Sequence, residues 1–255
     1  MLLEVKRLTE KYHTGFFGQK SVKAVDDVSF TINEGDIFGL VGESGCGKST
    51  VTKIILGLLK PTLGSVLYEG RDLTKVTRKD WYHLRKEIQV VFQHPQSMFN
   101  PRRNIYFSCA EPIKLYKMAH NKAEEEELVY ELIERVGLSR DQLEKYPHEI
   151  SGGQAQRLSI VRALSLNPKL LICDEPTSML DVSVQAQILN LLKINKGHNL
   201  SMLYISHDLE IIRAICNRVA VMRRGKIVEM GTVEEVFENP QHEYTKHLLA
   251  SNLVV

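Results

Sequence analysis

One nine-residue stretch limits the possible folds more than any other part of the chain. Residues 42–50 read Gly-Glu-Ser-Gly-Cys-Gly-Lys-Ser-Thr and match the phosphate-binding pattern G-x-x-x-x-G-K-[ST]. A short apolar run over 36–41 precedes this stretch, and residues 51–59 carry apolar side chains at helical spacing. The stretch therefore lies between a predicted buried strand and a predicted helix, which indicates an α/β fold that binds a nucleoside triphosphate.

The residue types in this loop explain why it suits phosphate. Its glycines allow successive backbone N–H groups to face phosphate oxygens, and the helix N-terminus adds a partial positive charge. We expect Lys48 to reach the β and γ phosphates and the Ser49 hydroxyl to ligate Mg²⁺. The predicted nucleotide-binding residues of the loop are Gly42, Ser44, Gly45, Cys46, Gly47, Lys48, Ser49 and Thr50.

The composition argues against several other classes of protein. The 255 residues suffice for one large α/β domain or two small ones, and the net charge of +2 gives no overall attraction to nucleic acid. The four cysteines form no C-x-x-C pair, so we expect neither disulfides nor a metal knuckle, and a reducing cytosol fits best. The N-terminus lacks a signal pattern, and the longest apolar run, around 54–59, is too short to span a bilayer.

The first forty residues predict strands. Leu3 and Val5 alternate with polar residues, and Tyr12 near the end of this strand is a candidate to stack on adenine, although a half-buried structural tyrosine is an equal alternative. Residues 13–23 are polar and are expected to form a loop. The alternation over 25–32, followed by turn residues 34–36, predicts a hairpin that leads into the strand before the phosphate loop.

Polar residues also follow three later apolar runs. Residues 88–92 end at Gln93, residues 170–173 end at Asp174 and Glu175, and residues 203–206 end at His207. The carboxyl ends of parallel strands line the ligand crevice of open α/β sheets, so we expect these side chains near the phosphates.

Each of these residues has a chemical role to fill at such a site. Asp174 is expected to hold Mg²⁺ with Ser49, and Glu175 to polarise a water toward the γ phosphate. Gln93 is a candidate contact for Mg²⁺ or for that water, and His207 a candidate contact for the γ phosphate.

Between about 104 and 167 helical periodicity replaces the strand pattern, which predicts a helical second lobe. Asn121 is expected to cap a helix whose first turn holds the acidic run 124–127, most simply a solvated face. Ser151 can cap another helix, and Gly152 and Gly153 make its start a second anion-binding position.

Together these residues and Asp181 resemble the ATP-binding cassette (ABC) family over essentially the whole chain. The resemblance implies a P-loop NTPase fold with an antiparallel β subdomain and a helical subdomain inserted after Gln93. It divides a single domain, 1–255, into a core of 1–93 and 168–255 and a helical part of about 94–167. It also implies ATP and Mg²⁺ as cofactors and ATP hydrolysis as the activity.

The family resemblance further implies two cassettes that close head to tail on two ATP molecules. The helix start at Ser151, Gly152, Gly153 and Gln154 would then bind the ATP held by the partner. By residue match, Glu175 is the general base, His207 the switch and Gln93 the γ-phosphate sensor. Asp181 lies in the loop between the two sites, and Tyr12 stacks on adenine.

Three stretches resemble the dipeptide, oligopeptide and nickel importer branch of this family: 95–102, 181–187 and the Asn-Pro-x-His-x-Tyr-Thr tail at 239–245. This implies a second cassette, usually a different chain, two membrane permeases and an extracytoplasmic binding protein, with this chain at the cytoplasmic face of the membrane and no nucleic acid partner. Its departures from the branch pattern are His94, Ile150, Met179 and Glu243. The alternatives are a soluble cassette ATPase acting on ribosomes or nucleic acid, and a nucleotide-sensing subunit.

Overall fold

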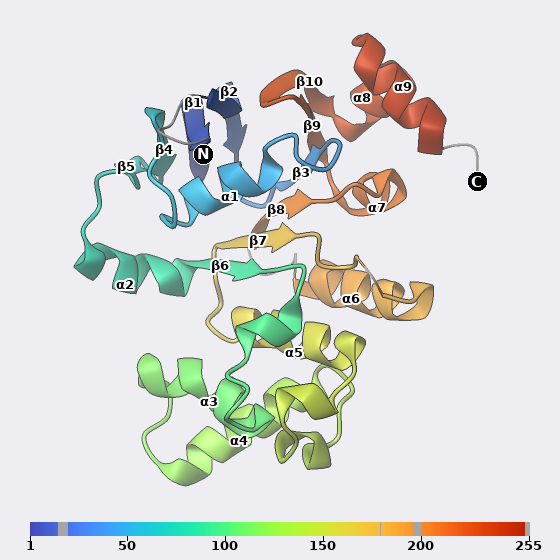
Figure 1. Ribbon diagram of the computed structural model, residues 1–255. Coiled ribbons are helices and arrows are strands. Elements are labelled where there is room, and N and C mark those ends of the chain that lie inside the picture. Colours follow the sequence, from blue (N-terminus) through green and yellow to red (C-terminus); the bar gives the residue numbers. More distant parts are fainter. Residues whose placement is uncertain (15–19, 179, 196–199, 253–255) are drawn as a thin grey trace.

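The computed structural model describes residues 1–14, 20–178, 180–195 and 200–252. Met179, which departs from the branch pattern, lies outside these ranges. Figure 1 shows both sheets in one half of the molecule and the helices α3, α4 and α5 in the other. A mixed α/β architecture with one antiparallel sheet and a helical region agrees with the predicted fold class.

The larger sheet has six strands in the order β10-β9-β3-β8-β7-β6. Its strands are β3 (Ile37–Val41), β6 (Ile88–Val91), β7 (Leu170–Asp174), β8 (Ser201–Ile205), β9 (Arg218–Arg223) and β10 (Lys226–Thr232). All neighbours pair in parallel except β9 and β10, which form an antiparallel hairpin. Every residue of β3 and β8 is buried, as expected for central parallel strands that are covered on both faces.

The smaller sheet is antiparallel, with the order β2-β1-β4-β5. Its strands are β1 (Leu3–Thr14), β2 (Lys20–Ile32), β4 (Leu63–Tyr68) and β5 (Arg71–Asp72). The predicted hairpin through residues 34–36 is wrong, because β2 pairs with β1 while β3 has β8 and β9 on its two sides. The predicted loop over 13–23 is also too long, since 13–14 and 20–23 are paired strand; residues 15–19 lie outside the described residues.

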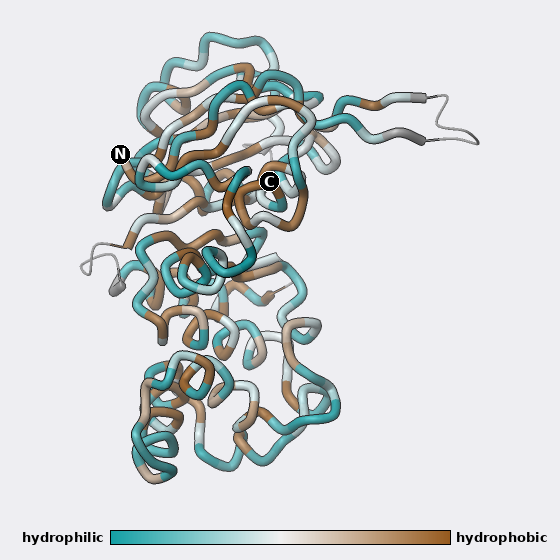
Figure 2. The backbone as a smooth tube through the Cα atoms, turned by 90° about the vertical axis from the view of Figure 1, so that its left-hand side faces the viewer, coloured by the Kyte–Doolittle hydropathy of each residue, from teal (hydrophilic) through white to brown (hydrophobic). Residues whose placement is uncertain are grey.

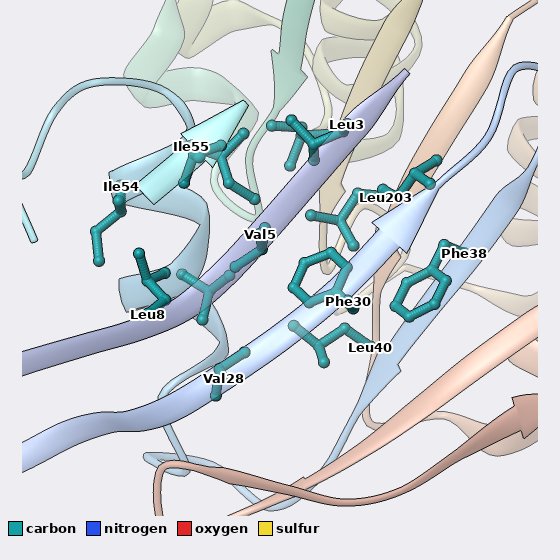
Figure 3. Close-up of a cluster of buried hydrophobic side chains, with 14 of the residues drawn as sticks. Leu3, Val5, Leu8, Val28, Phe30, Phe38, Leu40, Ile54, Ile55 and Leu203 are labelled. Carbon is teal, nitrogen blue, oxygen red and sulfur yellow. The ribbon is translucent and has the colours of Figure 1, made fainter. Parts of the chain in front are cut away.

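The two faces of the six-stranded sheet belong to different hydrophobic cores. Phe38 and Leu40 point into a core between the sheets, where Phe30 stacks on Phe38 at 5.0 Å between ring centroids (Figure 3). Ile37 and Val41 point to the opposite face and join the core beneath the helices α6 (Val182–Asn195) and α7 (Leu209–Ile215). The two-residue alternation of a strand thus divides β3 between both cores.

The helical half is built from α3 (Ile105–Leu115), α4 (Lys122–Glu134) and α5 (Gly152–Leu164), which enclose a third core. Side chains of Asn104, Asn121 and Ser151 accept a backbone N–H at the start of each helix, as N-caps do. The expectation of a solvated acidic face is wrong at Glu125. This residue is buried, and its carboxylate accepts bonds from the Tyr106 hydroxyl and the Lys122 ammonium.

The remaining helices flank the two sheets. Helix α1 (Lys48–Ile55) follows β3, and α2 (Arg78–Glu87) leads into β6. Helices α8 (Val233–Glu238) and α9 (Glu243–Asn252) follow the β9–β10 hairpin. Figure 2 shows the hydrophobic residues mostly in the interior of the molecule and the hydrophilic ones mostly along its outline. In the described part of the chain, every helix is too short or too polar to cross a bilayer.

Glu229 of β10 fixes the start of α9. Its carboxylate accepts the backbone N–H groups of Gln241 at 2.7 Å and of His242 at 3.0 Å. The next turn is closed by His242, whose Nδ1 accepts the N–H of Tyr244 at 3.1 Å. Partial burial tends to raise the pKa of Glu229, but these hydrogen bonds outweigh it and lower the pKa below the ordinary 4.5.

The Glu229→Gln substitution should therefore destabilise the protein in a pH-dependent way. The lowered pKa means that the charged carboxylate contributes stability above the unfolded-state value, and that this contribution is lost as pH falls through the native-state value. We expect the free energy of unfolding to drop by about 1–2 kcal/mol at pH 7, with the difference from the wild type shrinking in acid. Urea unfolding at several pH values measures this. Exposed Glu127→Gln is the control, and an equal loss at every pH would contradict the assignment.

A candidate nucleotide site at the carboxyl edge of the central sheet

The phosphate loop connects β3 to α1 and is held against two neighbouring backbones. A Cβ on Gly42 (φ +148°) would lie 2.1 Å from the carbonyl oxygen of Met222, and one on Gly47 (φ +114°) would lie 2.2 Å from that of Ala24. Any residue other than glycine would clash with these carbonyls at both positions, and its backbone would be strained at such positive φ values. The loop conformation is therefore set by β9 and β2 as well as by its own sequence.

Lys48 begins α1, and its side chain folds back over the loop. Its ammonium donates to the carbonyl oxygens of Gly42 at 2.6 Å and of Glu43 at 3.0 Å, and it lies 3.7 Å from Sγ of Cys46. The side chain is buried, and a buried cation needs partners of this kind. Burial also raises the pKa of the Cys46 thiol, despite the nearby Lys48 charge.

Two acidic residues follow one another at the end of β7. Burial raises the pKa of the Asp174 carboxyl, and the charge of the adjacent Glu175 adds to the rise. The positive charge of Lys48 and a hydrogen bond with the Ser49 hydroxyl act in the opposite direction. Asp174 is thus next to the phosphate loop, as predicted, in surroundings where an additional cation would favour its ionised form.

Three strand ends converge on Glu175. Gln93 follows β6, and its Nε2 donates a hydrogen bond to the Glu175 carboxylate at 3.1 Å. His207 follows β8, and its Nδ1 lies 3.4 Å from the same carboxylate. The backbone N–H of Glu175 donates to the carbonyl of Ile205 at 2.9 Å, and its φ of +51° is unusual for a residue with a side chain. The convergence expected from the sequence is therefore present, with Glu175 at its centre.

Other predicted residues lie apart from this cluster. Tyr12 is exposed and pairs across the β1–β2 ladder with Val22, and among the described residues no hydrogen bond or ring contact joins it to the phosphate loop. Asp181 is exposed just before α6, and its backbone carbonyl oxygen accepts the N–H of Gln185 at 2.9 Å. The adenine-stacking prediction for Tyr12 is not tested by this geometry.

The start of α5 is likewise away from the phosphate loop. Ser151 and Gln154 form a capping box, in which each side chain accepts the backbone N–H of the other residue. Ser151 and Gly152 are exposed, whereas a Cβ on Gly153 would lie 2.9 Å from Cγ1 of Val184 on α6. The two glycines therefore have different physical reasons for being glycine.

This difference predicts opposite outcomes for two matched substitutions. Gly153→Ala should lower the free energy of unfolding by about 1–2 kcal/mol, because the new methyl group overlaps Val184. Gly152→Ala points into open space in the first turn of a helix and should change stability by less than about 0.5 kcal/mol or raise it. Thermal and urea unfolding of both variants would test this, and equal losses would contradict the packing of α5 on α6.

Sequence reasoning did not assign a role to Tyr244. Its hydroxyl accepts the backbone N–H of Glu43 in the phosphate loop at 3.3 Å, and the guanidinium of Arg223 lies 4.6 Å from its ring centroid. The Asn-Pro-x-His-x-Tyr-Thr pattern at 239–245 marks this segment in the sequence. The pattern does not indicate which part of the fold the segment contacts.

The phosphate loop and the acidic strand end together define the class of a P-loop nucleoside triphosphatase. Residues 25–178 match the family model described as ABC transporter. Oligopeptide transport ATP-binding protein OppF of Streptococcus mutans is 45% identical over 98% of this chain and 81% of its own length, and that of Bacillus subtilis 44% identical over 98% and 82%. The chain belongs to the ABC transporter family, and it is an ATP-binding ATPase of that family.

Solved structures agree with this membership. A dimeric ATP-binding cassette in a post-hydrolysis state bound to ADP and Pi is 28% identical, with a TM-score of 0.82 over 91% of this chain and 99% of that one. The cbiO1 protein of Clostridium perfringens, part of an ABC transporter complex, is 29% identical, with a TM-score of 0.78 over 93% and 91%. These likenesses confirm the predicted ABC ATPase fold.

Proposed function

We propose that this chain hydrolyses ATP to power the import of oligopeptides through partner membrane subunits. The observation that carries the proposal is the convergence of Gln93 and His207 on the Glu175 carboxylate at the strand end beside the phosphate loop. The names of the relatives in Streptococcus mutans and Bacillus subtilis support oligopeptides over nickel or metal chelates as cargo.

In this proposal, the phosphate loop and one acid bind the nucleotide. Lys48 would exchange its present carbonyl partners for the β and γ phosphate oxygens, and the loop N–H groups would face the phosphates. Ser49, Asp174 and the amide oxygen of Gln93 would offer the oxygen ligands that Mg²⁺ prefers. Within the described residues no cluster of three or more His, Cys, Asp or Glu side chains could hold a metal ion.

Glu175 is the proposed general base. Its side chain is one-fifth exposed, so it can reach a water, and the hydrogen bond from Gln93 fixes its orientation. His207 is well exposed at 64% and can turn toward the γ phosphate that arrives with ATP. The backbone of Glu175 is in the left-handed region, with a φ of +51°, a conformation that is often retained at functional sites.

The exposed start of α5 is proposed to bind the nucleotide of a second cassette, identical or different. Gly152 leaves open space in front of the helix N-terminus, which favours an anion. Asp181 would lie in the loop between the two sites, and Tyr12 would stack on adenine. In the same proposal residues 1–93 and 168–255 form the core, and about 94–167 form a helical part that moves relative to it.

A groove between the two halves suits the permease. A cavity of about 430 Å³ lies between α2, β6, α3 and α5, lined by apolar side chains such as Trp81, Pro112 and Leu115. Arg85 and Arg162 provide its basic groups, and Phe92, next to Gln93, also lines it. We propose that a cytoplasmic segment of a permease docks here, which places the chain peripherally at the inner face of the membrane. An extracytoplasmic binding protein would deliver the cargo.

Replacing the proposed base should separate binding from turnover. Glu175→Gln keeps the size of the side chain and the phosphate ligands but removes the proton acceptor, so steady-state ATP hydrolysis should fall about 10²–10⁴-fold. ATP affinity should stay within about twofold of the wild type, because Lys48 and the loop are untouched. Phosphate release and an ATP titration measure the two quantities. Near-normal hydrolysis would contradict the role of Glu175.

The transport assignment is testable in the native host. Cells that lack this chain and require one amino acid should fail to grow when that residue is supplied only within an oligopeptide, yet grow normally on the free amino acid. Expression of the wild-type chain should restore growth, and the Glu175→Gln variant should not. Normal peptide use together with loss of nickel uptake would instead favour the nickel alternative. Co-purification with ribosomes instead of two membrane subunits would favour the soluble one.

A further inference from the structure

The C-terminal helix α9 contacts the phosphate loop directly. The hydroxyl of Tyr244 accepts the backbone N–H of Glu43 at 3.3 Å. Only 5% of Tyr244 is exposed, although residues 43–45 of the loop that it contacts are exposed. Burial raises the pKa of this hydroxyl, so it stays protonated at neutral pH.

The surroundings hold the tyrosine ring in a fixed place. The guanidinium of Arg223, at the end of β9, lies 4.6 Å from the ring centroid, within the range of a cation–π interaction. His242 closes the turn before the tyrosine, and Glu229 holds that turn onto β10. The Asn-Pro-x-His-x-Tyr-Thr tail thus has a physical task, because it brings one hydroxyl to the phosphate loop.

A single peptide unit links this hydroxyl to Lys48. The peptide between Gly42 and Glu43 donates its N–H to Tyr244, and the carbonyl of the same peptide accepts the Lys48 ammonium at 2.6 Å. Gly42 also packs so closely on the carbonyl of Met222 that no Cβ fits there. The orientation of this peptide is therefore determined from α9, from β9 and from Lys48 itself.

We propose that Tyr244 is a positioning residue for nucleotide binding, acting through the Gly42–Glu43 peptide on Lys48. The C-terminal helix holds the phosphate loop ready for the triphosphate, so less order has to be created when ATP binds. This inference rests on the proposed contact of Lys48 with the β and γ phosphates. It adds a connection between the end of the chain and the loop near residue 42, about 200 positions away in sequence.

The proposal predicts that the effect of Tyr244 depends on the phosphate chain of the ligand. Tyr244→Phe removes the hydroxyl and keeps the ring beneath Arg223. Loss of one neutral hydrogen bond should weaken binding of trinitrophenyl-ATP about three- to tenfold. Trinitrophenyl-AMP has no β or γ phosphate for Lys48, so its affinity should change by less than about twofold on the same reasoning. Fluorescence titration of the full chain without divalent cations measures both affinities.

Two further variants make the result specific. Tyr68 is also a buried tyrosine, and its hydroxyl donates a hydrogen bond to Glu87 at 3.2 Å. It lies on β4, in the four-stranded antiparallel sheet. Tyr68→Phe controls for a general loss of stability and should leave both affinities unchanged. Lys48→Met should show the pattern of Tyr244→Phe with a larger loss for trinitrophenyl-ATP, which checks the phosphate assignment independently.

Each outcome decides the matter. Unchanged affinities in Tyr244→Phe, or equal losses for both nucleotides, would overturn the positioning role. If Lys48→Met weakened trinitrophenyl-ATP binding while Tyr244→Phe did not, the inference would fail and the proposed function would stand. If Lys48→Met left trinitrophenyl-ATP binding intact, the phosphate assignment would fail together with the inference.

Discussion

The parallel pairing of β6, β7 and β8 is the constraint on which the site depends. Parallel strands in register end at the same edge of a sheet, so the residues that follow them must meet there. Asp174 is level with Ile205 across the β7–β8 ladder, and Val91 is level with Cys173 across the β6–β7 ladder. A shift of one residue in either register would turn alternate side chains to the other face and separate Gln93 and His207 from Glu175.

Charged side chains lie close together at the carboxyl edge of the six-stranded sheet. Asp174 and Glu175 are adjacent carboxylates, and the burial of Asp174 raises its pKa. Lys48 is next to them but directs its ammonium to loop carbonyls. A bound nucleotide would bring negative phosphates to Lys48, and its cation would bring positive charge to the two carboxylates. Sites for binding and catalysis are often arranged in this way, with groups that the ligand satisfies better than the protein does.

Much of this organisation could be predicted from the sequence because local signals and global fold agree. The glycines and Lys48 of the phosphate loop, the caps at Asn121 and Ser151 and the apolar runs before Gln93 and Glu175 each have a local physical cause. Their convergence then follows from the general behaviour of parallel sheets. For this reason the sequence alone predicts the fold class and the cluster around Glu175.

What escaped prediction depends on which segments pair over long distances. The turn at 34–36 has hairpin residues, yet it joins two sheets, because β8 and β9 occupy both edges of β3. Glu125 follows the sequence pattern of an exposed acid, but Tyr106 and Lys122 cover it. Tyr244 lies about two hundred residues from the loop that it contacts, and hydrophobic periodicity does not predict contacts between segments so far apart in the sequence.

The most direct test of the account is a structure of the chain with Mg²⁺ and a non-hydrolysable ATP analogue. The account predicts that the triphosphate lies along residues 42–50, with the ion between Ser49 and Asp174 and with Glu175 facing the γ phosphate. A nucleotide bound elsewhere, or a Glu175 carboxylate directed away from the γ phosphate, would contradict it.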